Sequence, residues 1–318
     1  MDRISKTYTF FIVYIIINIA SSAAVFAIPA LSAADPMLYN IIGQLAMFIP
    51  TLFVGVKMFG EGPKETFLLN RPAVFDIIEA VILVIALMPV ISFLSMIMLM
   101  FFPNNTAEAL TVAYDSPLAL SIISICVIPA VFEELVFRGI IFSGLKNVSL
   151  KKACIMGGLL FAIAHFDPQQ ALYTFLIGSL FCYVAYRTRS IFPSMVSHFT
   201  INFSQLMMSR IALAATGTAE TDITTEQAIG QLFGSYFILS LASVPIIIYI
   251  LSLMGRKNGR GKPLLKPLLS DRNPQNYSFT IENESVLDYN PQKIYEEGLI
   301  KWQLIVIIVL YILIIFFN

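Results

Sequence analysis

Two histidines occur in this chain of 318 residues, and both lie in strongly apolar segments. His165 follows Phe161 by four residues, and His198 precedes Asn202 by four, so each pair shares one face of a helix. Imidazoles transfer protons, and carboxamides donate hydrogen bonds. Such groups can also simply cap a helix end or join two helices. In an apolar environment, however, polar clusters indicate a functional site by default.

A third polar cluster lies in the apolar run 131–142, where Glu134 and Arg138 are spaced for an ion pair on one helix face. Glu133 points about 100° away from Glu134, which leaves its carboxylate free. Pro129 cannot donate to the carbonyl of Ile125, so we expect a local kink that opens space beside Glu133. The alternative interpretation is a buried ion-pair group that only holds helices together.

The composition is that of a membrane protein. Hydrophobic residues make up 58% of the chain and charged residues 13%, against about 25% charged residues in soluble domains. Twenty basic and 20 acidic residues balance, which gives no sign of nucleic-acid binding. The three cysteines, Cys126, Cys154 and Cys182, lie in apolar runs without paired spacing, so we expect small core residues rather than disulfides.

The sequence predicts an all-α, polytopic transmembrane helix bundle, because lipid cannot satisfy an exposed backbone. The predicted spans are Tyr8–Leu31, Tyr39–Phe59, Val74–Phe102, Leu118–Leu145, Lys152–Phe166, Gln170–Tyr186, Phe192–Leu213, Ile229–Met254 and Trp302–Phe317. Eighteen of the 20 basic residues then fall on one side of the membrane. By the positive-inside rule, the N-terminus is cytoplasmic and the C-terminus is outside.

Four regions follow from this pattern. We expect N-terminal transmembrane helices over 1–115, a catalytic transmembrane domain over 116–254, a polar cytoplasmic linker over 255–301 and a C-terminal transmembrane helix over 302–318. The linker is basic at first, which favours contact with anionic headgroups.

Depth connects the three clusters. Glu133, His165 and Asn202 are each 13 residues from a basic residue at the cytoplasmic edge of their own span. At 1.5 Å per residue, each lies about 20 Å from that edge. Three unrelated structural roles do not predict a common level, whereas one polar site inside the bundle does.

Hydrolysis of an amide suits these groups. Glu133 could take a proton from water, His165 could position that water, and His198 and Asn202 could stabilise the oxyanion. Alternatively, Glu133, His165 and His198 form a three-ligand zinc set. The residue types alone do not separate the two mechanisms. A His-Glu-x-x-His helix, a Gly-x-Gly-Asp motif, a serine elbow and aspartate-rich phosphate motifs do not occur.

The ordered motifs resemble the CPBP family of CAAX proteases and bacteriocin-processing enzymes, also called Abi. They are Glu133-Glu134-x-x-x-Arg138, Phe161-x-x-x-His165 and His198-x-x-x-Asn202, and the resemblance covers roughly Ser116–Gln205. It implies an eight-helix intramembrane endopeptidase, related to type II CAAX prenyl endopeptidases and lysostaphin-resistance-like proteins. Glu133 would be the general base with His165, His198 and Asn202 would form the oxyanion hole, and Glu134, Arg138 and Phe161 would support the site. A ninth span departs from the family pattern.

We therefore expect an endopeptidase of the bacterial plasma membrane that acts on a peptide or protein, lipidated or not, reaching the site from the cytoplasm. Membrane lipid is the other expected partner, and no nucleic acid is. A metal-free glutamate mechanism without a cofactor is favoured over zinc. The competing interpretations are a non-catalytic scaffold or immunity protein that keeps the fold, and a transporter with a polar site at mid-membrane.

Overall fold

The computed structural model describes residues 1–32, 34–216, 225–254 and 298–317, and these contain helices and no strand. Most of the expected linker 255–301 lies outside the described residues. The elements are α1 (Arg3–Phe26), α2 (Pro29–Ser32), α3 (Pro36–Phe59), α4 (Pro63–Thr66), α5 (Val74–Leu99), α6 (Asn105–Asp115), α7 (Leu118–Ser121), η1 (Ile122–Val127), α8 (Ile128–Glu134), η2 (Leu135–Ile141), α9 (Phe142–Gly144), α10 (Leu150–Ala164), η3 (Pro168–Gln170), α11 (Ala171–Thr188), α12 (Phe192–Thr216), α13 (Thr225–Leu253) and α15 (Trp302–Phe317).

The long helices have the length and composition of membrane spans, which confirms an all-helical integral membrane protein. Five stretches among the described residues are long and apolar enough to cross a bilayer: Arg3–Phe26, Pro36–Phe59, Val74–Leu99, Leu118–Gly144 and Phe233–Leu253. α15 is a shorter apolar helix. The first helix ends at Phe26, five residues before the predicted end of its span, and α2 follows it.

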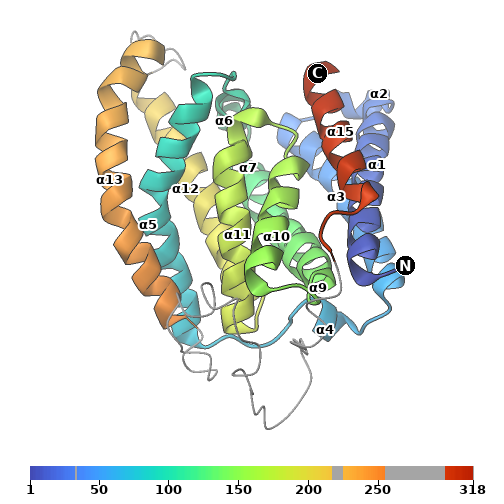
Figure 1. Ribbon diagram of the computed structural model, residues 1–318. Helices are drawn as coiled ribbons and strands as arrows, with labels where there is room; N and C mark the ends of the chain where they lie inside the picture. Colours follow the sequence, from blue (N-terminus) through green and yellow to red (C-terminus); the bar gives the residue numbers. More distant parts are fainter. Residues whose placement is uncertain (33, 217–224, 255–297, 318) are drawn as a thin grey trace.

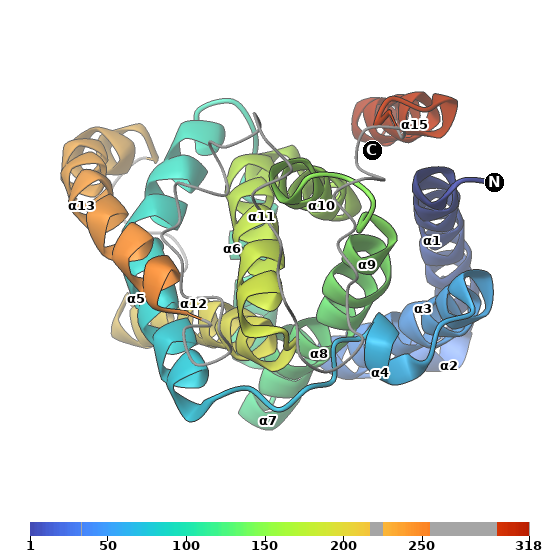
Figure 2. The same cartoon turned by 60° about the horizontal axis from the view of Figure 1, so that its bottom comes forward.

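The helices form a bundle in which neighbours in sequence often pair in space (Figure 1). α10 packs along α11, α13 packs along α5, and α1 contacts both α3 and α15 (Figure 2). The α10–α11 pair is close because glycines face each other: a Cβ added at Gly178 would lie 2.8 Å from the Cα of Gly158. Small residues at such a contact let two membrane helices approach closely.

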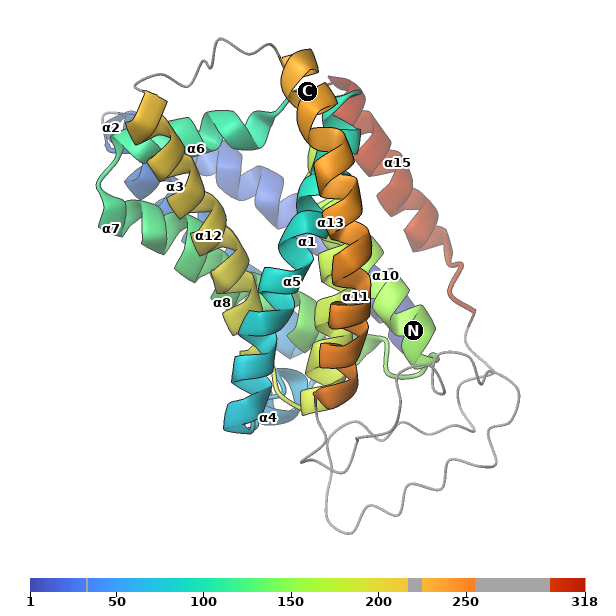
Figure 3. The ribbon, with the colours of Figure 1, turned by 90° about the vertical axis from the view of Figure 1, so that its left-hand side faces the viewer.

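The segment between α5 and α7, which lies between two predicted spans, folds into a helix of 11 residues. α6 lies across the end of the bundle at which α7 begins (Figure 3). Asn104 caps it, since its Oδ1 accepts a hydrogen bond from the backbone N–H of Ala107 at 3.1 Å. In this position α6 covers one end of the bundle, and Lys146, which follows α9, lies at the other end.

The fourth long helix, 118–144, departs twice from α-helical geometry. Residues Ile122–Val127 and Leu135–Ile141 are π-helical, a form that occurs mostly as short bulges and often at functional sites. In the first segment, the N–H of Ile128 bonds to the carbonyl of Ile123. The carbonyl of Ser124 thereby loses its α-helical donor, and its π-helical donor would be Pro129, which has no N–H. Pro129 also leaves Ile125 without its α-helical donor.

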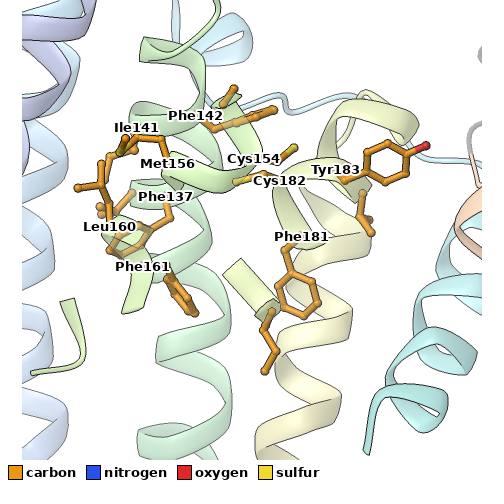
Figure 4. Close-up of a cluster of buried hydrophobic side chains, with 14 of the residues drawn as sticks. Phe137, Ile141, Phe142, Cys154, Met156, Leu160, Phe161, Phe181, Cys182 and Tyr183 are labelled. Carbon is orange, nitrogen blue, oxygen red and sulfur yellow. The ribbon is translucent and has the colours of Figure 1, made fainter. Parts of the chain in front are cut away.

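Buried aromatic and sulfur-containing side chains fill the space between this helix, α10 and α11 (Figure 4). Phe137 meets Phe161 edge to face, with ring centroids 5.0 Å apart. Cys154 and Cys182 belong to this core, and Cys126 is buried in a smaller one. All three cysteines are free and buried, which confirms the expectation that they are core residues.

An ionic cluster joins three segments at the end of the bundle that holds Lys146. Glu61 Oε1 lies 2.8 Å from Arg3 Nη1 and 2.7 Å from Lys146 Nζ. Arg3 Nε also donates to the carbonyl of Ser143 at 3.2 Å. The cluster connects the start of α1, the segment after α3 and the end of α9. Arg3 and Lys146, which the charge pattern assigns to one side of the membrane, thus lie at one end of the bundle.

Glu61 should make stability depend on pH in the acid range. Burial disfavours its charged form, but the hydrogen bonds and charges of Arg3 and Lys146 outweigh this and hold the pKa of Glu61 below its ordinary value of 4.5. A lowered pKa stabilises the fold above the ordinary value, and this contribution disappears as pH falls through the lowered one. At pH 7 we expect Glu61→Gln to lower the free energy of unfolding by about 1 kcal/mol.

Thermal unfolding in detergent from pH 7 down to pH 3 would measure this. The difference between the wild type and Glu61→Gln should shrink below about pH 4.5, because the wild-type carboxylate is then being protonated. Glu108→Gln on the exposed face of α6 is the control. A wild-type minus Glu61→Gln difference that stays constant with pH would contradict the expectation.

Candidate active site

One cavity of about 230 Å³ receives all four residues predicted to be catalytic. Glu133 reaches it from α8, His165 from the end of α10, and His198 and Asn202 from α12. Phe161 also lines it. The cavity extends toward α6, so it occupies the half of the bundle that α6 covers. The remaining lining residues are Asn40, Gln44, Thr106, Ala109, Leu110, Ser124, Ile125, Pro129, Gln170, Tyr173, Thr174, Ile177, Ile201 and Gln205.

Glu133 presents a carboxylate that is largely shielded and has one unengaged oxygen. Its side chain is 20% exposed, and Oε2 is buried without a hydrogen-bond partner among the described residues. Oε2 lies 3.9 Å from Nε2 of His198, which is too long for a direct hydrogen bond. A carboxylate held in this way can accept a proton from a molecule that enters the cavity.

Glu134 lies outside the cavity and is fully buried in an ion pair with Arg138, as their spacing predicts. Arg138 Nη1 donates to Glu134 Oε1 at 2.8 Å, and both side chains are inaccessible to solvent. The guanidinium lies 4.5 Å from the ring centroid of Phe161 and 5.2 Å from that of Phe181, two rings that approach from α10 and α11 (Figure 4). Arg138 Nη2 also donates to the carbonyl of Gly178 at 3.3 Å.

The carboxylate of Glu134 determines which ring nitrogen of His198 carries a hydrogen. Nδ1 of His198 lies 2.9 Å from Oε1 of Glu134, and a carboxylate only accepts, so the hydrogen is on Nδ1. Nε2 is left for the cavity, on the side of Glu133. A neutral ring would accept a hydrogen bond through Nε2, whereas a protonated ring donates one. The ion pair Glu134–Arg138 therefore acts on the cavity through His198.

His165 is the C-terminal cap of α10. Its Nδ1 lies 2.8 Å from the carbonyl oxygen of Phe161, which makes Nδ1 the donor and leaves Nε2 free to accept. The ring meets Phe161 edge to face, with centroids 4.7 Å apart. Phe166 follows with a φ of +50°, in a region that a bulky residue rarely adopts. Such strain persists only where surrounding contacts fix it, and it is common at functional sites.

Asn202 is oriented by the helix irregularity around Pro129. Its Nδ2 donates to the carbonyl of Ile125 at 2.8 Å, which is the carbonyl that Pro129 deprives of its α-helical donor. One N–H of the carboxamide is used there, and the second N–H remains for the cavity. Asn202 follows His198 by one helical turn, so the two donors lie on one wall of the cavity.

A metal site was the open alternative. Among the residues that the structure describes, no group of three or more His, Cys, Asp or Glu side chains is arranged to hold a metal ion. Glu133, His165 and His198 share the cavity, but they do not form such a group. The present arrangement therefore does not fit the three-ligand zinc set, and no step of the reaction below uses a metal.

Sequence reasoning did not single out the polar residues that α3 contributes to the cavity. Asn40 donates through Nδ2 to Ser124 Oγ at 2.9 Å, and Gln44 donates through Nε2 to the carbonyl of Ser124 at 3.0 Å. The two are spaced four residues apart in an apolar span. Polar residues within an apolar span are also the pattern that distinguishes the three motif clusters.

An all-helical membrane protein with a shielded carboxylate, two imidazoles and a carboxamide around one cavity has the features of an intramembrane hydrolase. Residues 115–204 match a family model described as type II CAAX prenyl endopeptidase Rce1-like. The match includes every motif residue, from Glu133 to Asn202, and confirms the CPBP resemblance. The segment that carries the site is therefore similar to a CAAX-type membrane protease. Curated proteins and solved structures give no match.

Proposed function

We propose that the protein is an intramembrane endopeptidase that hydrolyses a peptide bond in a membrane-associated protein or peptide. One observation carries this proposal: Glu133, His165, His198 and Asn202, from three separate helices, line one cavity in which a carboxylate oxygen of Glu133 has no partner. The family match over residues 115–204 supports the same reaction class.

In the proposed reaction, Glu133 removes a proton from a water molecule whose other hydrogen is directed by Nε2 of His165. The water oxygen bonds to the carbonyl carbon of the peptide, and the carbonyl π electrons move onto oxygen. Nε2–H of protonated His198 and the second N–H of Asn202 donate to this oxyanion, each contributing up to a few kcal/mol. The C–N bond then breaks, and Glu133 returns the proton to the leaving amine.

Glu134 supports His198 in this scheme. The oxyanion role requires a hydrogen on Nε2 as well as on Nδ1, and the contact of Nδ1 with Glu134 Oε1 at 2.9 Å fixes the ring so that Nε2 faces the cavity. Arg138 neutralises Glu134 and, between the rings of Phe161 and Phe181, holds it in place. The mechanism needs no cofactor, and the alternative is a zinc-dependent version of the same protease.

We further propose eight core helices plus α15 as a ninth, C-terminal span, with the chain divided as 1–115, 116–254, 255–301 and 302–318. The charge pattern favours a cytoplasmic N-terminus and an outer C-terminus, and we propose the bacterial plasma membrane as the location. The cavity extends from Glu133 toward α6, away from the Lys146 end. We therefore propose that substrate enters from the α6 side or from the bilayer, in place of the cytoplasmic route expected from the sequence.

The test is cleavage by purified protein in detergent micelles, read by mass spectrometry. The panel holds a peptide ending in farnesylated cysteine, two aliphatic residues and methionine, its unlipidated counterpart, and an apolar membrane-spanning peptide. We expect cleavage that persists after EDTA treatment and zinc depletion verified by elemental analysis. Activity lost on depletion and restored by zinc would overturn the metal-free mechanism. Absence of any cleavage would favour the scaffold or immunity interpretation.

A further inference from the structure

The π-helical turn before Pro129 anchors two carboxamides. Asn202 donates to the carbonyl of Ile125 at 2.8 Å, and Gln44 donates to the adjacent carbonyl of Ser124 at 3.0 Å. Both carbonyls lack their α-helical donor. Pro129 has no N–H to donate to Ile125, and the N–H of Ile128 bonds to Ile123 instead of Ser124. One irregularity therefore orients a side chain from α12 and a side chain from α3, and both residues line one cavity.

The two carboxamides offer different groups to a ligand. With its nitrogen fixed on Ser124, Gln44 must turn its carbonyl oxygen away from that residue. Gln44 Oε1 is buried and has no hydrogen-bond partner among the described residues. Leaving a buried acceptor unsatisfied costs about 1–3 kcal/mol. Because the residue Gln44 lines the cavity, a ligand in the cavity is the natural source of the missing donor.

A peptide in extended conformation supplies such donors at regular spacing. Ser124 precedes Glu133 by nine residues, which corresponds to about 13 Å along the helix. An extended chain advances about 3.3 Å per residue, so Gln44 is about three or four residues from a bond cleaved beside Glu133. The direction from Glu133 to Ser124 leads toward α6, which is also the direction in which the cavity extends.

We propose that Gln44 is a substrate-binding residue, whose Oε1 accepts a backbone N–H of the peptide about three or four residues from the cleaved bond. The proposal rests on the proposed function, since it assumes a peptide substrate. It assigns to Gln44 the recognition of the peptide main chain rather than of a particular side chain. The proposal therefore predicts that many residue types are tolerated at that position and that an amide is preferred to an ester.

The experiment pairs a change in the protein with a change in the peptide. The farnesylated peptide is extended by several residues and synthesised as a series in which each amide in turn is replaced by an ester, which removes one N–H. Binding of the fluorescently labelled series to Glu133→Gln protein is followed by anisotropy, so that no cleavage occurs. One ester should weaken binding about tenfold, the size of one hydrogen bond. In Gln44→Leu/Glu133→Gln protein, that ester should bind as well as the parent amide.

Gln303→Leu in the Glu133→Gln background is the matched control. Gln303 is also buried with an unpartnered Oε1, but it belongs to α15 and does not line the cavity. The control should keep the full ester effect. The assignment would be overturned if no single ester weakened binding. It would also be overturned if the ester that weakens binding did so equally in Gln44→Leu/Glu133→Gln protein.

Cleavage measurements separate this outcome from failure of the proposed function. If wild-type protein cleaves the parent peptide and Gln44→Leu raises KM about tenfold with kcat little changed, both proposals stand. If the wild type cleaves and Gln44→Leu has wild-type KM, only the role of Gln44 falls. If the wild type cleaves none of the panel peptides, the protease assignment falls, while the anisotropy series still decides whether Gln44 binds an amide.

Discussion

Glu133→Gln should lower kcat for peptide cleavage by about a thousandfold, within the range of about a hundredfold to ten-thousandfold for a general base. Glutamine keeps the size and polarity of glutamate but cannot accept a proton from water. KM should change little, because the role of Glu133 is in the reaction rather than in binding. Steady-state kinetics with the peptide that the wild type cleaves fastest would measure both constants.

Stability provides the control for this substitution. Oε2 of Glu133 has no hydrogen-bond partner to lose, so the unfolding temperature of Glu133→Gln should stay close to that of the wild type. Glu108→Gln, on the exposed side of α6, should keep both activity and stability. A Glu133→Gln protein that is folded and cleaves at the wild-type rate would refute the proposed mechanism. One that is inactive because it is unfolded would instead assign Glu133 a structural role.

Arg138→Met should destabilise the protein by about 3–5 kcal/mol, the usual cost of removing one partner from a buried ion pair. Glu134 would remain buried without the positive charge of Arg138, with His198 and Ser194 as its polar neighbours. The stacking of the guanidinium between Phe161 and Phe181 would also be lost. Arg138→Lys should rescue little, because a compact ammonium group cannot stack between two rings or reproduce the planar fork that reaches both Glu134 and the carbonyl of Gly178.

The double variant Glu134→Leu/Arg138→Met separates stability from activity. Without either charge, much of the stability lost in Arg138→Met should return, since apolar residues of similar volume often replace a buried pair at little cost. Activity should not return, because Nδ1 of His198 has lost its carboxylate. Unfolding by denaturing detergent, followed by circular dichroism, measures the first effect and peptide cleavage the second. An Arg138→Met protein as stable as the wild type would contradict the assigned role of the pair.

The fold was predictable from the sequence where hydrophobicity alone determines it. Each expected span contains a helix, and the helix before His165 ends where Phe166, Asp167 and Pro168 require it to end. The number of spans was not predictable with the same certainty. α10 is short for a full crossing, while α11 and α12 carry polar side chains that face the site, which lowers the apolar signal of their segments.

The motif residues were predictable as one site because polar groups in lipid must find one another. Their detailed partners were not. Pro129 indicated a kink, but a π-helical turn depends on which backbone groups neighbouring helices can satisfy, and Gln44 and Asn202 belong to two other helices. α6 was missed for a related reason. Its 11 residues are too few and too polar for a span, so only its position over the bundle gives it a role.

The burial of all three thiols has a practical consequence for following the protein at work. Cys126 and Cys182 are fully inaccessible and Cys154 is 7% exposed, so dyes and spin labels that react with surface thiols should leave the native chain unmodified. A single cysteine introduced at Ala107, on the exposed surface of α6, would then carry the only label. Its spectrum in the presence and absence of peptide would report directly whether α6 moves when the cavity fills.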